Sequence, residues 1–278
     1  MKIGRRLAIK LLNASKFALG MGDLRASLDE PVTEMGFVEA VEVVDGSVRV
    51  AFRLPTYWCS PNFAFLMVED VHKAVTALPG VRSVEVDLLD HLHGEEIAAA
   101  VREGRSFADA LGEAAGDADL LELRRTFEDK AFQRRQEAVL LDLRSQGFDD
   151  AGIASMCLSV FDRLRFVGAE ARRRAPLYRA LLVKRGLVRS GRDPVFVTLD
   201  GAPIPAAEMW AHLGRLRRVR INMEFSGALC RGLKQHRYKE AVREDGELTL
   251  IDFLPGASAS RTQNAPPDRA SRRPAQGG

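Results

Sequence analysis

The chain has 278 residues, of which 46% are hydrophobic, and this suits one large globular domain or two small ones. Its three cysteines, Cys59, Cys157 and Cys230, lie far apart in the sequence, which argues against a paired-cysteine zinc site and against a disulfide framework. A reducing cytoplasm is therefore the expected compartment. No segment approaches the roughly 18 consecutive apolar residues of a membrane-spanning helix, so we expect no membrane partner.

The net charge of +3 hides an asymmetry along the chain. Residues 1–100 carry 10 basic and 14 acidic side chains, whereas the rest of the chain carries 31 basic and 24 acidic ones. Because only the later part is basic, it is the only candidate for binding an anionic partner. The asymmetry also predicts two differently charged structural units.

The first part of the chain shows helical and extended patterns in turn. Two runs rich in β-branched residues flank Asp45-Gly46, a dipeptide that favours the tight turn of a β-hairpin. The helix and strand that follow complete an α-β-β-α-β order, which predicts a three-stranded sheet with helices on one face. In chain order, the predicted elements are helices over 3–18 and 23–28, strands over 37–44 and 48–54, a helix over 63–78 and a strand over 81–88.

Beyond residue 90 the chain is rich in Ala, Leu, Arg and Glu, which predicts mainly helix. Short strands are expected over 194–199 and 248–253. From residue 256 onward the composition is Pro, Ser, Arg, Gln and Gly with few apolar side chains, which predicts a disordered tail. The expected helices cover 94–102, 105–113, 118–145, 149–156, 158–186 and 206–217.

These patterns predict an α+β protein with two structural units and a tail. Residues 1–100 would form the small α-β-β-α-β domain, whose three-stranded sheet is covered by helices on one face. Residues 101–255 would form a mainly α-helical, basic region. Residues 256–278 would be the disordered tail.

Cys59 is the residue best placed for chemistry. It lies between a predicted strand and a predicted helix, where unpaired backbone N–H groups and the helix dipole favour a thiolate. A thiolate is the form of cysteine that binds iron and soft metals. The alternative is that Cys59 is a small, half-buried apolar residue, and its position alone does not decide between the two interpretations.

Several short motifs follow one another over residues 20–90. They are Met35-Gly36-Phe37-Val38, the Asp45-Gly46 turn, the cysteine at the strand-helix junction, Leu78-Pro79-Gly80-Val81 and Val84-Glu85-Val86. In this order they resemble the iron-sulfur cluster assembly domain family. That family includes bacterial factors linked to the Suf system and to phenylacetate oxygenase operons, and a eukaryotic component of cytosolic iron-sulfur protein assembly.

The resemblance implies that Cys59 is a ligand for iron or for an iron-sulfur cluster that is bound transiently, with the acidic residues Asp29 and Glu34 nearby. One cysteine cannot complete a four-thiolate cluster, so a homodimer, a partner protein or a small thiol would supply the remaining ligands. The flanks depart from the family pattern, because Tyr57 and Trp58 replace small residues. These rings would either shield the thiolate or plug the site.

A second candidate site is the segment Asp90-His91-Leu92-His93-Gly94-Glu95-Glu96, which holds ligand types suited to a divalent metal. It does not match the zinc motif HExxH. A polar linker that begins a helix, with acidic residues near the positive end of the helix dipole, explains the same residues. His91 and His93 are therefore weaker metal-ligand candidates than Cys59.

The function implied by the resemblance is that of a non-catalytic accessory factor for the assembly of iron-sulfur clusters or iron centres in a client metalloenzyme, with other assembly proteins as further partners. Relatives in phenylacetate operons make a bacterial multicomponent oxygenase a candidate client. The sequence has no dinucleotide fingerprint, no phosphate loop and no GxSxG elbow, so we expect no enzymatic activity.

Two alternatives stay open. The basic runs Arg172-Arg173-Arg174 and 215–220 could contact phosphate oxygens, as in a nucleic-acid-binding regulator, although solvated helix faces explain them better. Nucleic acid is not the partner we expect. The other alternative is a purely structural interaction module, which would need no thiolate at Cys59.

Overall fold

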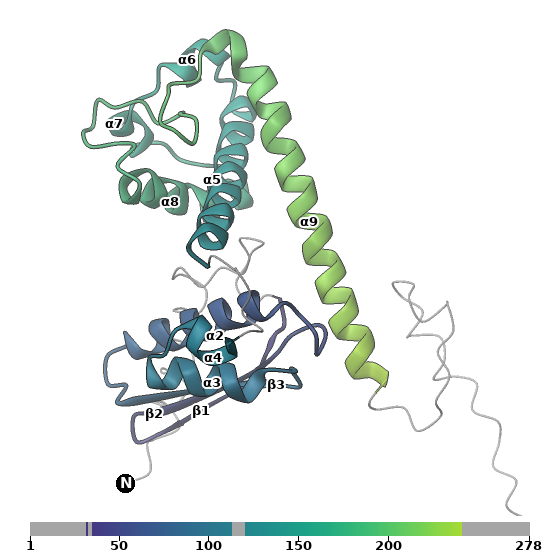
Figure 1. Ribbon diagram of the computed structural model, residues 1–278. Coiled ribbons are helices and arrows are strands. Elements are labelled where there is room, and N and C mark those ends of the chain that lie inside the picture. The colour runs from purple at the N-terminus through teal and green to yellow at the C-terminus, as the bar shows by residue number, and fades with distance from the viewer. Residues whose placement is uncertain (1–31, 33–34, 113–119, 241–278) are drawn as a thin grey trace, which may run out of the picture.

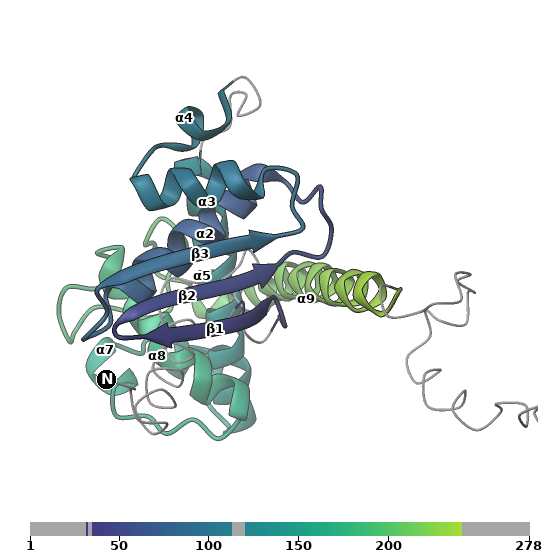
Figure 2. The ribbon, with the colours of Figure 1, turned by 90° about the horizontal axis from the view of Figure 1, so that it is seen from below.

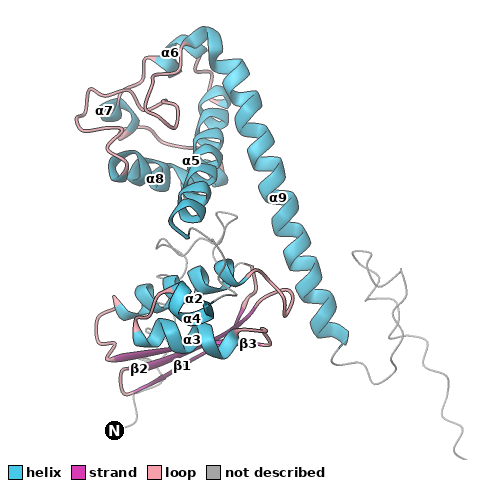
Figure 3. Ribbon diagram, in the orientation of Figure 1, coloured by secondary structure: helices cyan, strands magenta, loops and turns pink. Residues whose placement is uncertain are grey.

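The computed structural model describes residues 32, 35–112 and 120–240 (Figure 1). It has the α+β architecture that the sequence predicts, with a three-stranded sheet and its helices followed by a region of helices and loops (Figure 3). The predicted helices at 3–18 and 23–28, the predicted strand at 248–253 and the predicted tail lie outside the described residues.

The sheet contains β1 (Val38–Val44), β2 (Ser47–Arg53) and β3 (Ser83–Leu89) in that spatial order. β1 and β2 are antiparallel, whereas β2 and β3 are parallel, with Val50 opposite Val86. The alternating pattern read from the sequence therefore buries every second residue of β2 and β3 against the helices. The predicted hairpin and third strand are confirmed.

Asp45 and Gly46 form the hairpin turn, as predicted. Their φ angles are 47° and 83°, and the type I′ turn needs positive φ at both positions. Gly46 is also a point of close approach, since a Cβ atom there would lie 2.8 Å from the carbonyl oxygen of Gly80. A side chain at this position is therefore disfavoured by both the backbone angle and the available space.

Two helices, α2 (Pro61–Thr76) and α3 (Gly94–Glu103), pack on one face of the sheet, and the short α4 (Phe107–Leu111) packs against α3 (Figure 2). α2 connects β2 to β3, which lets these strands run parallel. The apolar core between sheet and helices extends past residue 100, which lies inside α3, to Phe107 in α4. The largest part of this core consists of Val48, Val50, Phe52, Val84, Val86, Leu88, Val68, Val71, Val75 and Ile97.

The later part of the chain has an apolar cluster of its own, which runs from Phe132 to Leu216. α5 packs against both α8 and α9. The helices are α5 (Leu120–Ser145), α6 (Asp150–Ala154), α7 (Leu158–Phe161), α8 (Ala169–Lys184), a 3-10 turn (Ala206–Glu208) and α9 (Met209–Glu240).

The prediction of one helix over 158–186 is wrong, because α7 and α8 are separate. The side chain of Asp142 accepts hydrogen bonds from the backbone N–H groups of Val167 (3.1 Å) and Gly168 (2.5 Å). These bonds hold the connecting segment outside helical geometry, and Gly168 has the extended backbone of a helix cap. The buried Asp142 side chain of α5 thus separates two helices that the local sequence pattern predicts as one.

The predicted strand over 194–199 is also wrong, since this segment makes only isolated bridges. The carbonyl oxygens of Val195 and Val197 accept hydrogen bonds from the Tyr178 hydroxyl (2.5 Å) and the Gln136 amide (2.8 Å). Buried side chains thereby take the acceptors that a neighbouring strand would use.

The helix predicted over 206–217 begins near its expected start but runs much further. α9 continues to Glu240, and no proline interrupts the chain after Pro205 before that residue. The sequence pattern fades because α9 leaves the apolar cluster of the helical part after Leu216. Its last turns lie against β1, through Lys234 and Glu39, and against Tyr57, through Arg237.

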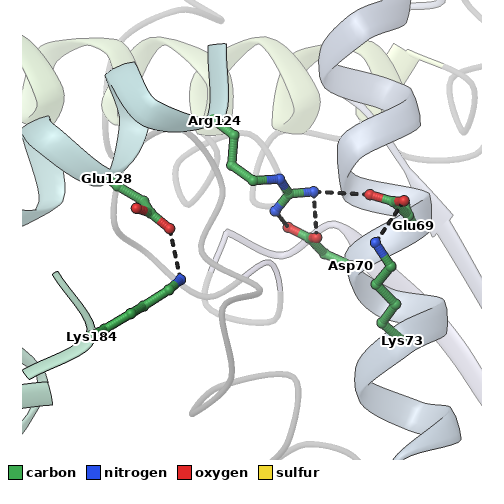
Figure 4. A network of polar contacts seen from close by, with 6 residues as sticks. All are labelled: Glu69, Asp70, Lys73, Arg124, Glu128 and Lys184. Carbon is green, nitrogen blue, oxygen red and sulfur yellow. Dashed lines mark hydrogen bonds and ion pairs between the residues drawn. The ribbon is translucent and has the colours of Figure 1, made fainter. Parts of the chain in front are cut away.

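The two parts of the molecule meet where α2 faces the start of α5. Phe63 stacks on Phe127 with ring centroids 5.0 Å apart. Arg124 donates a hydrogen bond to Asp70 (3.0 Å) and another to Glu69 (3.0 Å), as Figure 4 shows. Burial raises the pKa of the Asp70 carboxyl above its ordinary value, and the Arg124 guanidinium opposes that effect.

Arg124→Leu should lower the free energy of unfolding by about 2 kcal/mol, because it leaves the buried Asp70 carboxylate without its charged partner. Urea unfolding followed by circular dichroism measures the loss. The matched control is Lys184→Leu, which removes the more exposed Lys184–Glu128 pair (2.8 Å) in the same region (Figure 4) and should cost less than about 0.5 kcal/mol. Equal losses in the two variants would contradict the prediction.

Candidate functional site

Cys59 lies in the loop between β2 and α2, where the sequence predicts it. Its thiol is free and half-buried, and it packs against the edge of the sheet-helix core. The backbone N–H of Cys59 donates to the carbonyl oxygen of Thr56 (3.4 Å), and the Thr56 hydroxyl lies 3.2 Å from the sulfur. Ser60, the next residue, is the N-cap of α2. The sulfur therefore has both partial solvent access and a hydroxyl group beside it.

His91 joins the Cys59 loop to the segment between β3 and α3. Its Nε2 lies 2.8 Å from the carbonyl oxygen of Cys59, and its Nδ1 accepts a hydrogen bond from the backbone N–H of His93 (3.2 Å). Because Nδ1 accepts, Nε2 carries the proton and donates to Cys59. The backbone N–H of Leu92 adds a second bond, to the carbonyl oxygen of Tyr57 (2.9 Å).

The electrostatics of His91 fit this structural role. Burial lowers the pKa of its imidazole below the ordinary value, so the ring is neutral at neutral pH. Both ring nitrogens make hydrogen bonds to the backbone, so His91 would have to give one up in order to bind a metal. The ring centroids of His91 and His93 are 6.3 Å apart. A metal role for this pair stays a prediction.

The remaining predicted ligands are two acidic residues that precede β1 in the sequence. Asp29 and Glu34 lie outside the described residues. Within the described part of the chain, no group of three or more His, Cys, Asp or Glu side chains is arranged to hold a metal ion. Within these residues, Cys59 is therefore not part of such a group.

Tyr57 and Trp58 project away from the core. The rings pack edge to face with centroids 4.4 Å apart, and 51% of Tyr57 and 63% of Trp58 are exposed. Both rings therefore keep a large part of their surface in solvent. The unusual flank of the cysteine thus presents an aromatic surface beside it.

The end of α9 lies against the Cys59 loop, an arrangement that the sequence does not predict. The Arg237 guanidinium lies over the Tyr57 ring at 5.6 Å from the centroid. Lys234 forms an ion pair with Glu39 (2.8 Å) and donates a hydrogen bond to the carbonyl oxygen of Gly36. A helix of the later part thus forms one side of the site.

An open pocket of about 620 Å³ lies beside Tyr57. It runs along the segment between β3 and α3 and reaches Arg237 of α9. Its walls carry both signs of charge, so a polar group or chain segment fits it better than an apolar ligand. The lining includes Arg49, Tyr57, Asp90, His91, Glu95 and Arg237.

Cys157 has surroundings that the sequence patterns did not predict. The Ser159 hydroxyl lies 3.2 Å from the Cys157 sulfur, and hydrogen bonds from Ser159 and from the backbone of Val160 lower the pKa of this thiol. The only sequence signal for this lowered pKa is a serine two positions after a cysteine at the start of a helix. Cys157 belongs to the helical part and supplies a useful control thiol.

The basic runs are partly neutralised by carboxylates. Arg173 and Arg174 both pair with Glu170, and Arg220 pairs with Glu137 (2.9 Å). Among the residues that the structure describes, these pairings favour solvated helix faces over a phosphate-binding surface. Over the same residues, no helix has both the length and the apolarity to cross a membrane.

Comparisons with curated proteins and with solved structures gave no significant match. A comparison with protein-family models matched residues 25–88 to the family described as iron-sulfur cluster assembly protein. The matched segment contains the hairpin, the Cys59 loop, α2 and most of β3, whereas α3 to α9 lie beyond it. Residues 25–88 are therefore similar to the iron-sulfur cluster assembly proteins, which confirms the resemblance seen in the sequence.

Proposed function

We propose that this protein is an accessory factor that carries iron or an iron-sulfur cluster on Cys59 as cargo and delivers it to a client metalloenzyme. The observation that carries this proposal is the position of Cys59, half-buried at the start of α2 within the segment that matches the assembly family. A thiolate is a ligand that iron and soft metals accept. The chain itself would perform no catalysis and would act in the cytoplasm, where thiols stay reduced.

The helical part would recognise the client. Large apolar side chains are exposed along α9, and the exposed rings of Tyr57 and Trp58 lie beside Cys59; surfaces of this kind are typical of protein-protein contacts. The resemblance to factors from phenylacetate oxygenase operons makes a bacterial multicomponent oxygenase the client class to test first. The exposed side chains on α9 are Ile221, Phe225, Leu229 and Leu233.

Anaerobic reconstitution of the full chain with Fe²⁺ and sulfide tests the proposal. The wild-type protein should acquire the visible absorption of a sulfur-ligated iron species, and metal analysis should find bound iron. Cys59→Ser should lose most of this iron, because an alcohol is a poor ligand for it. Cys157→Ser should behave as the wild type and serves as the control for a cysteine outside the site.

Iron binding by Cys59→Ser at the wild-type level would rule out Cys59 as the carrier. Salt dependence separates the nucleic-acid alternative from client docking. Binding to DNA or RNA should weaken steeply as salt rises, whereas docking through the apolar face of α9 should not. A structural interaction module would support client maturation equally well with Cys59 or Ser at this position.

A further inference from the structure

α9 extends from the helical part back to the sheet (Figure 1). Its last turns carry Cys230, Lys234 and Arg237, which are spaced four and three residues apart and so share one face of the helix. Lys234 contacts Gly36 and Glu39 before and within β1, and Arg237 contacts Tyr57 in the Cys59 loop. The face that bears Cys230 is therefore the face that lies against the domain matched to the assembly family.

Cys230 is fixed in this position by contacts of its own. Its thiol is free and half-buried, and it packs against the same apolar core as the Cys59 thiol. The next residue, Arg231, lies with its guanidinium 3.5 Å from the sulfur of Met35, a buried residue of that core. Both cysteines therefore lie at the boundary between α9 and the small domain.

The surroundings of Cys230 act on its thiol. Burial raises the pKa of the Cys230 thiol above its ordinary value, and the neighbouring Cys59 thiol raises it further. The effect of Cys59 agrees with the packing of both side chains on one apolar core.

We propose that Cys230 supplies a second thiolate to the Cys59 site, so that the iron cargo is held between the assembly-like domain and α9. This rests on the function proposed above for Cys59. Two thiolates bind Fe²⁺ more strongly than one and leave coordination positions open for sulfide, a small thiol or a ligand of the client.

Cobalt titration of the full chain under anaerobic conditions counts the thiolates, because each Co²⁺–thiolate bond adds charge-transfer absorption in the near ultraviolet. The wild-type protein and Cys157→Ser should give equal intensity per bound Co²⁺. Cys230→Ser should give about half of that intensity and bind Co²⁺ at least about tenfold more weakly, which is the typical cost of losing a ligand interaction. Cys59→Ser should also lose at least half.

The outcomes separate the two proposals. If Cys59→Ser loses the cobalt signal but Cys230→Ser keeps the full intensity and affinity, Cys230 is not a ligand and only this inference fails. If Cys59→Ser keeps the full signal, the carrier function proposed for Cys59 fails as well. Equal losses in Cys157→Ser would show that the absorption does not come from the proposed pair.

The proximity of the thiols can be measured without metal. A bifunctional bromobimane reagent, which alkylates two neighbouring thiols, should link Cys59 to Cys230 within one chain, and peptide mass spectrometry identifies the bridge. Excess Co²⁺ or Fe²⁺ should protect both thiols from the reagent. If the reagent bridges no Cys59–Cys230 pair in the folded protein, the two cysteines do not face one another and the inference is wrong.

Discussion

Gln136→Leu is expected to lower the free energy of unfolding of the helical part by about 3 kcal/mol. Gln136 is fully buried in α5, and its side-chain amide nitrogen donates to the carbonyl oxygen of Val197 (2.8 Å) and to the Tyr178 hydroxyl (2.7 Å). Its side-chain oxygen lies 2.6 Å from Nε2 of His212. Leucine fills a similar volume but leaves a buried carbonyl and a buried N–H group without partners.

Urea unfolding followed by tryptophan fluorescence measures this loss. In a Trp58→Phe background the remaining tryptophan, Trp210 at the start of α9, reports on the helical part alone. Gln235→Leu is the control, because Gln235 is exposed on α9, the helix that carries Trp210, and its substitution should change stability by less than about 0.5 kcal/mol. A loss in Gln136→Leu no larger than the control would show that the buried polar network contributes little.

Acidification is expected to destabilise the same region by up to about 3 kcal/mol between pH 6.5 and pH 4. Only 7% of His212 is exposed, and burial lowers the pKa of its imidazole from 6.5 to about 4, with Arg215 adding to the effect. The folded state therefore holds a neutral ring, whereas the unfolded chain takes up a proton near pH 6.5. The stabilisation is complete above pH 6.5 and is lost as the pH falls toward 4.

His212→Gln isolates this contribution. The amide nitrogen of glutamine can still donate to Gln136, but the side chain does not titrate. The difference in unfolding free energy between wild type and His212→Gln should shrink or change sign as the pH falls from 6.5 to 4. If the two proteins lose the same stability over that range, His212 titrates at its ordinary pKa and its burial has no electrostatic cost.

The network around Gln136 stabilises the helical part and does not take part in the proposed function. It does, however, position the start of α9, because His212 lies one turn into that helix. The far end of the same helix carries Cys230. A stable origin for α9 is therefore a condition for bringing the second thiol to Cys59.

Local signals were sufficient for the small domain. Asp45-Gly46 predicts the hairpin because the turn depends only on the φ angles of these two residues. Cys59 lies where the sequence predicts it because a strand and a helix with a proline near its start flank it. The motifs that resemble the assembly family lie in the segment that the family model matches.

Contacts between distant parts of the chain could not be predicted from the sequence. His91 suggested a metal ligand by its residue type, but its hydrogen bond to the Cys59 carbonyl depends on how two loops meet. The separation of α7 from α8 depends on Asp142, a side chain of α5, and nothing in the local pattern marks it. Each of these features arises from a partner that lies far away in the sequence.

The position of Cys59 follows from residues within a few positions of it, since turns, caps and alternating strands act over short distances. The proposed pairing of Cys59 with Cys230 does not follow from nearby residues. That pairing requires a long α9 whose origin is held by the buried network and whose end is docked by Lys234 and Arg237. Because it depends on the packing of two separate cores against one helix, only the folded molecule brings the two thiols together.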